Sequence, residues 1–266
     1  MWLRTGNLLA TLAVGAYTVS GAIIYQNDFS SDPSADFTTY YDGASYVYDG
    51  EADRVDAQRN VLERASWYQL TGAATSQADV FVKTAINITV GTPNNLYAVI
   101  GGLYGRATPG AGTYSQGYYA LLGRPSWDRD DPTVRLYLGK DFDPNMTGTA
   151  ADMGTVLSTG TYEASGSTDY ILKLSMNDTY LVAQLWNGAG DTLLEQLSAD
   201  DSQYSSGNVG FVTAVRSSST HYLYDDFLVD NEPLENAVPE PGTSLLWLLG
   251  LASCVRRRRF RVASVP

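Results

Sequence analysis

Along the middle of the chain, apolar and polar residues alternate with a period of two. Between residues 80 and 89, valine, threonine and isoleucine occupy the even positions, whereas the odd positions hold a mixed set that includes Lys83 and Asn87. This alternation predicts a β-strand with one buried face. The glycine, proline and asparagine residues within 91–95 predict the turn that ends it.

Further short apolar segments follow, each bounded by glycine, proline, asparagine or aspartate. They predict strands at residues 96–103, 118–122, 134–138, 170–176, 179–186, 192–197, 209–215 and 222–229. Asn177-Asp178 predicts a hairpin, the glycines from Gly101 to Gly105 predict a tight turn, and a short helical turn is expected near Ala57 to Ala65. Many short strands without alternating helices predict an all-β antiparallel sandwich or barrel.

The first residues of the chain have a different pattern. Arg4 precedes an apolar stretch at residues 8–19, and the small residues Ser20-Gly21-Ala22 follow it. A basic start, a short apolar segment and a small-residue cleavage site predict a signal peptide at residues 1–22, cleaved after Ala22. An uncleaved membrane anchor is the alternative.

Near the C-terminus, a proline-bounded segment, an apolar stretch at residues 243–255 and a basic cluster follow one another. The segment and the cluster consist of Pro239, Glu240 and Pro241, and of Arg256, Arg257, Arg258 and Arg259. The apolar stretch is shorter than the roughly 20 residues that span a bilayer, but Trp247 and the arginines extend it at the interfaces. The arginines stay cytoplasmic, which places the body outside the inner membrane. A buried C-terminal helix of a soluble domain is the alternative.

This order of parts resembles the PEP-CTERM sorting tail of bacterial exported proteins. The resemblance implies export, transient anchoring in the inner membrane by a helix and arginine cluster at residues 243–261, and processing by an exosortase-type transpeptidase. The protein would then reach the cell surface or the extracellular matrix. A linker at residues 233–242, which holds the Pro-Glu-Pro motif, would join this tail to a body at residues 23–232.

The body itself opens and closes with aromatic and acidic segments that could pair as strands. These are Tyr25 to Phe29 and Tyr224 to Val229. Together with the strand pattern at 170–174, 181–185 and 206–211, they resemble the concanavalin A or laminin-G type of lectin-like jelly roll. The resemblance implies a two-sheet antiparallel sandwich, and glycan binding is its commonest implied use.

Charge narrows the choice of partners. Of the 17 basic residues, six lie in the predicted signal peptide and tail, and of the 29 acidic residues only Glu240 does. Residues 23–238 therefore carry 11 positive and 28 negative charges, a net charge of −17. This balance disfavours nucleic acid and anionic polymers, and it suits divalent cations and neutral sugars. The only cysteine, Cys254, lies in the tail, which excludes disulfides and a thiol nucleophile from the body.

Two sets of acidic residues are candidate cation ligands. Asp28 and Asp226, with Asp225 as an alternate, lie on the first and last predicted strands and could clamp a structural Ca²⁺. Capping of strand ends is the alternative role. The segment Asp141 to Gly148 places oxygen ligands at alternate positions, but it lacks the glycine and glutamate of a calcium-binding EF-hand loop, and a solvated acidic loop is favoured.

A catalytic function has one candidate motif. Residues 51–56 nearly match the Glu-x-Asp-x-x-Glu strand of jelly-roll glycoside hydrolases, with Glu51 and Asp53 in place and Asp56 where the family has glutamate. Retaining hydrolysis needs two carboxyl groups about 5 to 5.5 Å apart, and the shorter Asp56 disturbs that spacing. His221 is the only histidine, which excludes a histidine-rich zinc site.

The aromatic residues are candidate sugar platforms. The chain has 19 tyrosines and five tryptophans, gathered around residues 40–48 and around Tyr118, Tyr119 and Trp127. The alternative is that tyrosine simply favours strands. The sequence therefore predicts an exported surface or matrix protein whose non-catalytic sandwich binds polysaccharide or is structural. The alternative is a secreted glycan-active enzyme that uses Glu51, Asp53 and Asp56.

Overall fold

The regular elements of the described residues are β-strands. The computed structural model describes residues 22–40, 44–49, 54–59, 65–71, 78–89, 99–108, 116–124, 133–143, 153–165, 168–215 and 221–231. Their strands are β1 (Ile23–Asn27), β2 (Phe37–Tyr40), β3 (Ala44–Asp49), β4 (Arg54–Arg59), β5 (Ala65–Leu70), β6 (Val80–Thr89), β7 (Val99–Thr108), β8 (Gln116–Arg124), β9 (Arg135–Lys140), β10 (Thr155–Thr159), β11 (Asp169–Asn177), β12 (Tyr180–Asn187), β13 (Leu193–Asp200), β14 (Asn208–Val215) and β15 (His221–Asp230).

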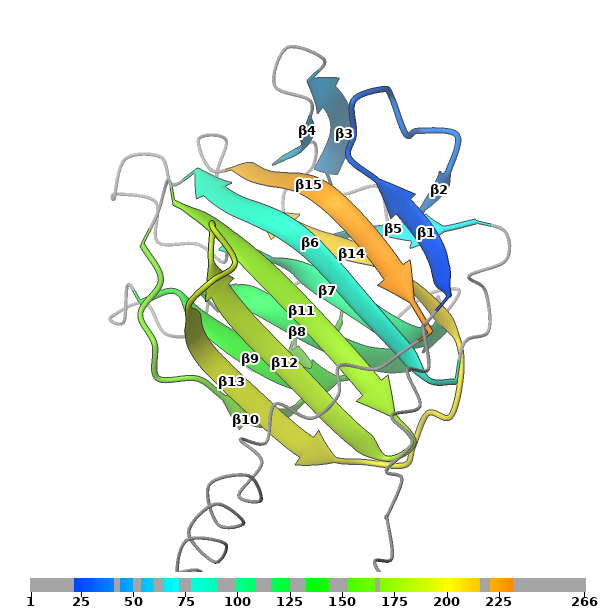
Figure 1. The fold of residues 1–266 in the computed structure, drawn as a ribbon, viewed down its shortest axis with the longest axis vertical. Coiled ribbons are helices and arrows are strands. Elements are labelled where there is room, and N and C mark those ends of the chain that lie inside the picture. Colours follow the sequence, from blue (N-terminus) through cyan, green and yellow to red (C-terminus); the bar gives the residue numbers. More distant parts are fainter. Residues whose placement is uncertain are drawn as a thin grey trace, which may run out of the picture.

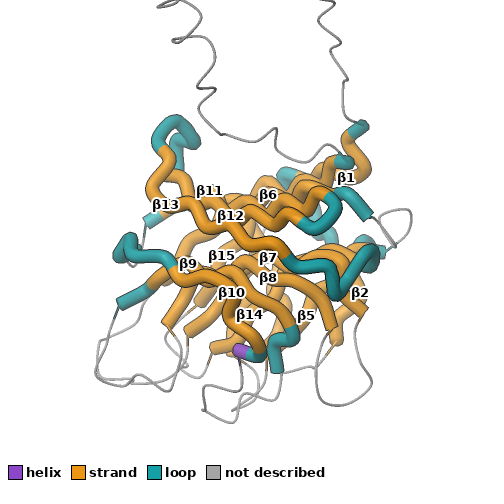
Figure 2. Tube along the Cα trace, turned by 90° about the horizontal axis from the view of Figure 1, so that it is seen from below, coloured by secondary structure: helices purple, strands orange, loops and turns teal. Residues whose placement is uncertain are grey.

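The strands form two antiparallel sheets that pack face to face (Figures 1 and 2). The eight-stranded sheet has the order β13-β12-β11-β6-β15-β4-β3, and β1 also pairs with β15. The seven-stranded sheet has the order β10-β9-β8-β7-β14-β5-β2. This arrangement confirms the predicted all-β two-sheet antiparallel sandwich.

The first and last strands of the body pair, as predicted. Asn27 lies opposite Phe227 and Ile23 lies opposite Asp230 in the antiparallel register of β1 and β15. The backbone N–H of Ala22 donates to Oδ1 of Asn231 at 2.9 Å, which places the start and end of this region side by side. Residues 22–231 therefore contain both sheets and close on themselves.

The core between the sheets is rich in tyrosine. The even-numbered residues of β6 are buried, as the alternation predicted. Tyr222 and Tyr224 reach across from the eight-stranded sheet, and their hydroxyls donate to the carbonyls of Leu122 at 2.9 Å and Val212 at 2.7 Å. A buried hydroxyl needs such a partner, and these bonds tie one sheet to the backbone of the other.

The predicted tight turn at Gly101 to Gly105 is wrong, because these residues lie inside β7. A side chain at Gly101 would come within 2.4 Å of the Tyr222 ring, and one at Gly105 within 2.1 Å of Met176. Glycine is present because side chains of the opposite sheet pack against the strand backbone. The Asn177-Asp178 hairpin is confirmed, with Asp178 at φ 50° between β11 and β12.

The helical turn expected near Ala57 to Ala65 is also wrong where the structure describes it. Ala57 to Arg59 belong to β4, and Ala65 begins β5. The polar sequence of β4 hides the strand, which obtains its backbone partners from β15 and β3. Pairing with neighbours outweighs local pattern in such a segment.

The outer face of the seven-stranded sheet is buried as well. It carries a second apolar cluster that consists of Ile100, Tyr104, Ala107, Tyr119, Leu121, Tyr137, Phe142, Met153 and Val212, each at most 8% exposed. The eight-stranded sheet differs, because the outward residues Lys83, Ala85 and Asn87 of β6 and Ile171 and Lys173 of β11 remain partly exposed. Of the two outer faces, the one on the eight-stranded sheet therefore offers side chains to a ligand.

No helix among the described residues is long and apolar enough to cross a membrane. The predicted signal peptide, apart from Ala22, and the tail with its linker lie outside the described residues.

A buried arginine joins the two sheets at one end. Arg106 has φ 49° at an irregular position of β7, and its side chain is 1% exposed. Its guanidinium donates to the carbonyls of Ala78 (2.5 Å), Asp178 (2.5 Å) and Tyr204 (3.2 Å), and it contacts Oδ1 of Asp79 at 3.3 Å. The same Asp79 oxygen accepts the backbone N–H of Asp178 at 2.8 Å.

Replacing this arginine should destabilise the fold strongly. Arg106→Met leaves three backbone carbonyls without their donor, and a buried acceptor without a partner costs about 1 to 3 kcal/mol, so we expect a loss of about 3 kcal/mol or more in the free energy of unfolding. Urea denaturation of residues 22–231 measures this loss. Arg54→Met is the control, because its partly exposed ion pairs are worth no more than about 1 kcal/mol. Equal losses in the two variants would contradict the assigned role of Arg106.

Candidate functional site

A polar depression lies on the outer face of the eight-stranded sheet. It has a volume of about 170 Å³ and is lined by Arg54, Ala85, Ile86, Asn87, Asp169, Tyr170, Gly188, Leu223, Asp225 and Asp226. These residues come from β4, β6, β11 and β15 and from the turn after β12. They meet where β6 ends and β11 begins, in the upper part of the sheet in Figure 1.

Strand register brings these side chains together. Asn87 of β6 lies opposite Asp169 of β11 on one side and opposite Leu223 of β15 on the other. Ala85 lies opposite Asp225, after which the register of β15 shifts and Asp226 adopts φ 49°. At this bulge β15 exchanges β4 for β1 as its second partner. Bulges commonly re-aim side chains next to functional sites.

The polar groups of the depression form a connected set. The Arg54 guanidinium lies 3.4 Å from Oδ1 of Asp169 and 3.9 Å from Oδ2 of Asp225. Asn87 donates its amide to Oδ1 of Asp169 at 2.7 Å. Oδ1 of Asn87 is buried and accepts no hydrogen bond from the described residues. The depression thus presents a cation and two carboxylates, with one unpartnered acceptor buried beneath them.

The surroundings of Asp225 disfavour the ionised form of its carboxyl group. Burial raises the pKa of Asp225, and the neighbouring charges of Asp226 and Asp28 raise it further, whereas the backbone N–H of Asp226 and the charge of Arg54 act in the opposite direction. A side chain held in such surroundings costs folding stability. This is a common property of residues that are kept for binding or chemistry.

Such a lining suits hydroxyl groups. A sugar hydroxyl can donate to Asp169 or Asp225 and accept from Arg54. Hydrogen bonds to charged partners are the stronger ones. Leu223 adds an apolar contact beside these polar groups. The arrangement can therefore bind a polyhydroxylated ring.

The predicted calcium ligands lie on adjoining strands next to the depression. Asp28 directly follows β1 and Asp226 occupies the bulge of β15, one step beyond the pair Asn27 and Phe227. Oδ1 of Asp28 accepts the backbone N–H of Ser30 at 3.1 Å, as a turn-capping residue does. No group of three or more acidic, histidine or cysteine residues in the described part of the chain could hold a metal ion. Two carboxylates supply fewer oxygen ligands than Ca²⁺ takes, and a site would need further oxygens. The structural Ca²⁺ therefore stays a prediction.

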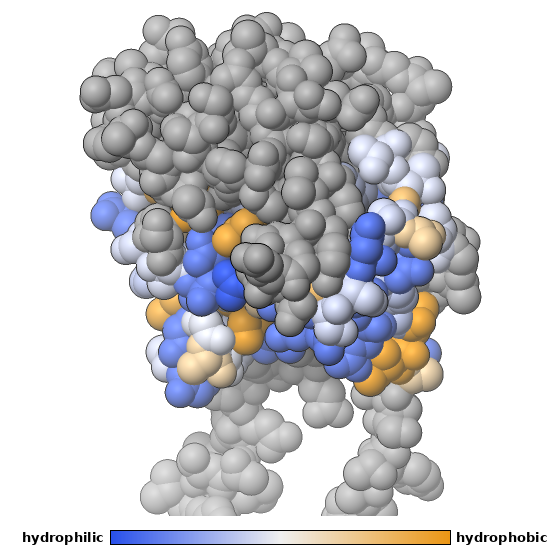
Figure 3. Space-filling model, turned by 90° about the horizontal axis from the view of Figure 1, so that it is seen from above, coloured by the Kyte–Doolittle hydropathy of each residue, from blue (hydrophilic) through white to orange (hydrophobic). Residues whose placement is uncertain are grey.

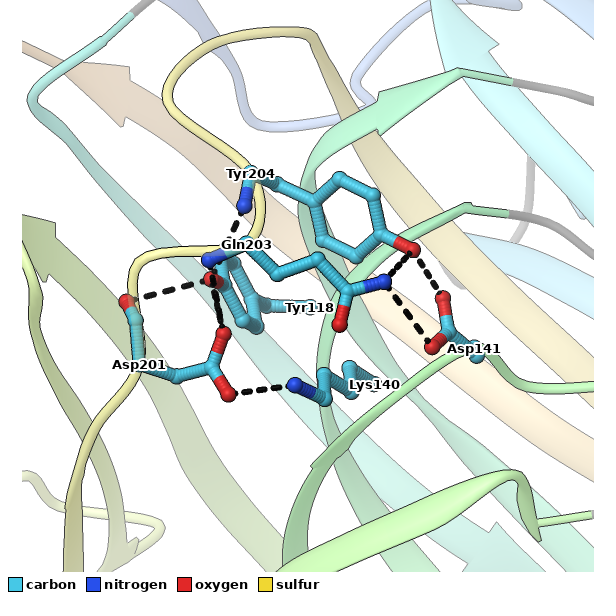
Figure 4. Close-up of polar contacts among 6 residues, drawn as sticks. All are labelled: Tyr118, Lys140, Asp141, Asp201, Gln203 and Tyr204. Carbon is cyan, nitrogen blue, oxygen red and sulfur yellow. Dashed lines mark hydrogen bonds and ion pairs between the residues drawn. The ribbon is translucent and has the colours of Figure 1, made fainter.

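The second acidic candidate has a structural partner instead. Figure 4 shows the Tyr204 hydroxyl donating to Asp141, while Lys140 pairs with Asp201 and Tyr118 donates to Asp201 at 2.7 Å. Burial and the bond to Asp141 raise the pKa of Tyr204. Asp143 is only 9% exposed, so the expected solvated loop is wrong for this residue. Residues 144–152 lie outside the described part.

The other predicted residues are placed as follows. Glu51 and Asp53 lie outside the described residues, and Asp56 lies in β4 opposite Leu223. Tyr118 and Tyr119 are 0% and 1% exposed, so the idea that they form a sugar platform is wrong. They pack in the two apolar clusters, because tyrosine fills a sandwich core and its hydroxyl finds a partner at the edge.

Most of the depression has no signal in the sequence. Arg54 stands out only as part of the glycosidase-like motif at residues 51–56, and Asn87 and Asp169 belong to no motif. Asn87 does occupy an outward position of a correctly predicted strand, which is the one signal that marked it. Figure 3 shows that the described surface visible from the end at the top of Figure 1 is largely hydrophilic, with smaller hydrophobic groups beside it.

Comparison with known proteins identifies the tail and the fold. Residues 237–259 match the PEP-CTERM protein-sorting motif, which implies export and membrane-associated sorting. The comparison with curated protein sequences finds no match.

Three solved structures illustrate the likeness of the body. A Bacillus subtilis protein with a galectin-like fold is 14% identical, with a TM-score of 0.56 over 79% of this chain and 96% of that chain. The winged bean acidic lectin in complex with methyl-α-D-galactose is 10% identical, with a TM-score of 0.55 over 79% and 98%. The Ca²⁺-bound exoplasmic/lumenal domain of VIP36 is 12% identical, with a TM-score of 0.56 over 79% and 90%. At these identities the likeness shows the fold, a lectin-like jelly roll.

Neutralising Asp225 should stabilise the protein. Because the folded pKa is raised, the protonated form is the stabilised one, and stability is lost as pH rises through the folded pKa. We expect Asp225→Asn to melt at a higher temperature than the wild type at pH 7. The difference should shrink below about pH 4, where the carboxyl is protonated in both states. Thermal melts from pH 3 to 8 measure this, with the exposed Asp200→Asn change in β13 as the control. A lower melting temperature for Asp225→Asn than for the wild type at pH 7 would contradict the conclusion that the charge of Asp225 destabilises the fold.

Proposed function

We propose that the chain is an exported bacterial surface or extracellular-matrix protein, sorted through its PEP-CTERM tail, whose non-catalytic β-sandwich binds polysaccharide. The observation that carries the proposal is the depression on the eight-stranded sheet, where Arg54, Asn87, Asp169 and Asp225 converge on an accessible surface. The fold supports it, because the winged bean lectin of similar fold is bound to a galactoside.

The position of the depression supports a role at a surface. The polypeptide leaves the sandwich after Asp230, at the end of β15 that pairs with the start of β1. Leu223 and Asp225 lie toward the other end of the same strand. A body held by a tail at residues 243–261 would thus carry its depression away from the membrane.

The charges in the depression suit the binding of hydroxyl groups. Arg54 lies within ion-pair distance of both Asp169 and Asp225. A surface that offers charged donors and acceptors side by side can bind hydroxyl groups in both directions. The raised pKa of Asp225 is also a property of a glycosidase general acid, so the enzymatic alternative is tested below together with binding.

We propose that an exosortase-type enzyme processes the tail near Pro239-Glu240-Pro241. The sorting motif at residues 237–259 supports this partner. Cleavage there would remove the helix and the arginine cluster and release the sandwich from the inner membrane into the matrix.

Substitutions in the depression should weaken polysaccharide binding. Asp169→Asn and Arg54→Gln each remove charged hydrogen bonds, so we expect affinity to fall by roughly tenfold or more. Affinity electrophoresis of residues 22–231 through gels that contain neutral polysaccharides measures this. Asp200→Asn, an exposed change in β13 of the same sheet, is the control.

Two results of that experiment would overturn the proposal. One is equal retardation of the Asp169→Asn variant and the wild type, and the other is no retardation by any polymer. If the protein released reducing ends from a bound polymer, the enzymatic alternative would replace the proposal of non-catalytic binding.

Tail processing has a direct readout. Mass spectrometry of the protein recovered from the cell exterior should show a C-terminus near residues 239–241, without the arginines at 256–259. The Glu240→Ala variant is expected to stay in the membrane fraction at full length. An exported mature form that retains Arg256 would contradict the processing step.

A further inference from the structure

The lysines of this chain are few and unevenly placed. It contains three, Lys83, Lys140 and Lys173. Lys140 pairs with Asp201 at the edge of the sandwich. Lys83 and Lys173 lie directly opposite each other in β6 and β11. Their sequence neighbours Val82 and Leu172 are buried between the sheets, so both lysines lie on the outer face that also carries the depression.

This pair is electrostatically unfavourable in the free protein. Like charges directly opposite each other on neighbouring strands destabilise a sheet. None of the ion pairs among the described residues involves Lys83 or Lys173, although the body is strongly acidic. Burial lowers the pKa of Lys173, and the charge of Lys83 lowers it further. An anion placed between the two ammonium groups would relieve this repulsion.

Neighbouring side chains hold Lys173 in place. Its Nζ lies 4.2 Å from the centroid of the Trp186 ring, in a cation–π contact. The indole N–H of Trp186 donates to Oε1 of Gln184 at 3.0 Å, and Nε2 of Gln184 donates to Oε1 of Gln196 at 2.7 Å. Gln184 is only 2% exposed. Hydrogen-bonded side chains on β12 and β13 thus position the ammonium group of Lys173.

We propose that Lys83 and Lys173 form a subsite for the carboxylate of a uronate residue in the polysaccharide that the depression binds. The subsite rests on the proposed function and names the class of its ligand. Asn87 and Lys83 are four residues apart in β6, about 13 Å at about 3.3 Å per residue. The outward pair Ala85 and Ile171 lies between them, so the depression and the lysines mark two points of one path along β6 and β11.

The net charge of the body restricts the ligand further. With a net −17 on residues 23–238, a densely charged polyanion is repelled, whereas an isolated carboxylate can reach the two lysines. The favoured ligand is a mainly neutral polysaccharide that carries uronate groups at intervals. The depression would take the neutral rings, and the lysine pair would take the acidic one.

The test uses one polymer in two forms. Glucuronoxylan carries uronate side groups at intervals, and reduction of its carboxyl groups gives a neutral form with the same backbone. We expect the full chain, in a non-ionic detergent and at constant ionic strength, to bind glucuronoxylan about tenfold more tightly than the reduced form. The double variant Lys83→Gln, Lys173→Gln should bind both forms equally. Lys140→Gln, the same change at the third lysine, should retain the preference.

A second variant separates binding from folding. Lys83→Glu replaces the like-charged pair by an opposite-charged one, so its melting temperature should rise while its preference for glucuronoxylan disappears. A preference that survives in the double variant overturns the subsite. Equal binding of the two polymers by the wild type also overturns it and leaves the proposed function standing. The proposed function itself fails separately, if the Asp169→Asn variant binds neutral polysaccharide as tightly as the wild type does.

Discussion

The guanidinium of Arg106 is the point at which the two sheets are locked to one another. It is almost fully buried, and its charge is balanced by three backbone carbonyls and one carboxylate from three segments that are distant in sequence. A buried cation tolerates little displacement of these partners, because each lost bond exposes an uncompensated charge. Arg106 belongs to the seven-stranded sheet, whereas Ala78 and Asp178 flank β6 and β11 of the eight-stranded sheet. The constraint therefore fixes the positions of the two strands that carry the candidate site.

The functional surface follows from the pairing of these strands. Each outward residue of β6 meets a defined partner on β11, so Asn87 faces Asp169 and Lys83 faces Lys173. A shift of one residue would turn every one of these side chains into the core. The other sheet has no comparable surface in its described residues, because its outer face is buried by a second apolar cluster. In the described residues, the outer face of the eight-stranded sheet is thus the polar one, and the depression and the lysine pair both lie on it.

Parts of the molecule followed from local pattern and others did not. The alternation in residues 80–89 and the Asn177-Asp178 turn predict their elements correctly, since both signals arise within a few residues. The glycines from Gly101 to Gly105 favour a turn locally, but their small size makes room for the Tyr222 ring and Met176 of the opposite sheet, which no local pattern reveals. Tyr118 and Tyr119 are a related case, because the neighbouring sequence does not show whether a tyrosine lies at the surface or in the core. The convergence of Asn87, Asp169 and Asp225 has no local signal, because these residues come from three strands that are distant in sequence, β6, β11 and β15.

The sequence by itself determined export with membrane-associated sorting and the class of fold. The sorting motif at residues 237–259 is a contiguous signal, and a period of two is a local consequence of strand geometry. Tertiary structure alone decided which polar residues meet. Arg54, Asn87, Asp169 and Asp225 converge because β4, β6, β11 and β15 are neighbours in one sheet, and that order depends on long-range pairing and on the buried contacts between sheets. Convergence of this kind is a property of the packed chain, and it has no counterpart in residue spacing.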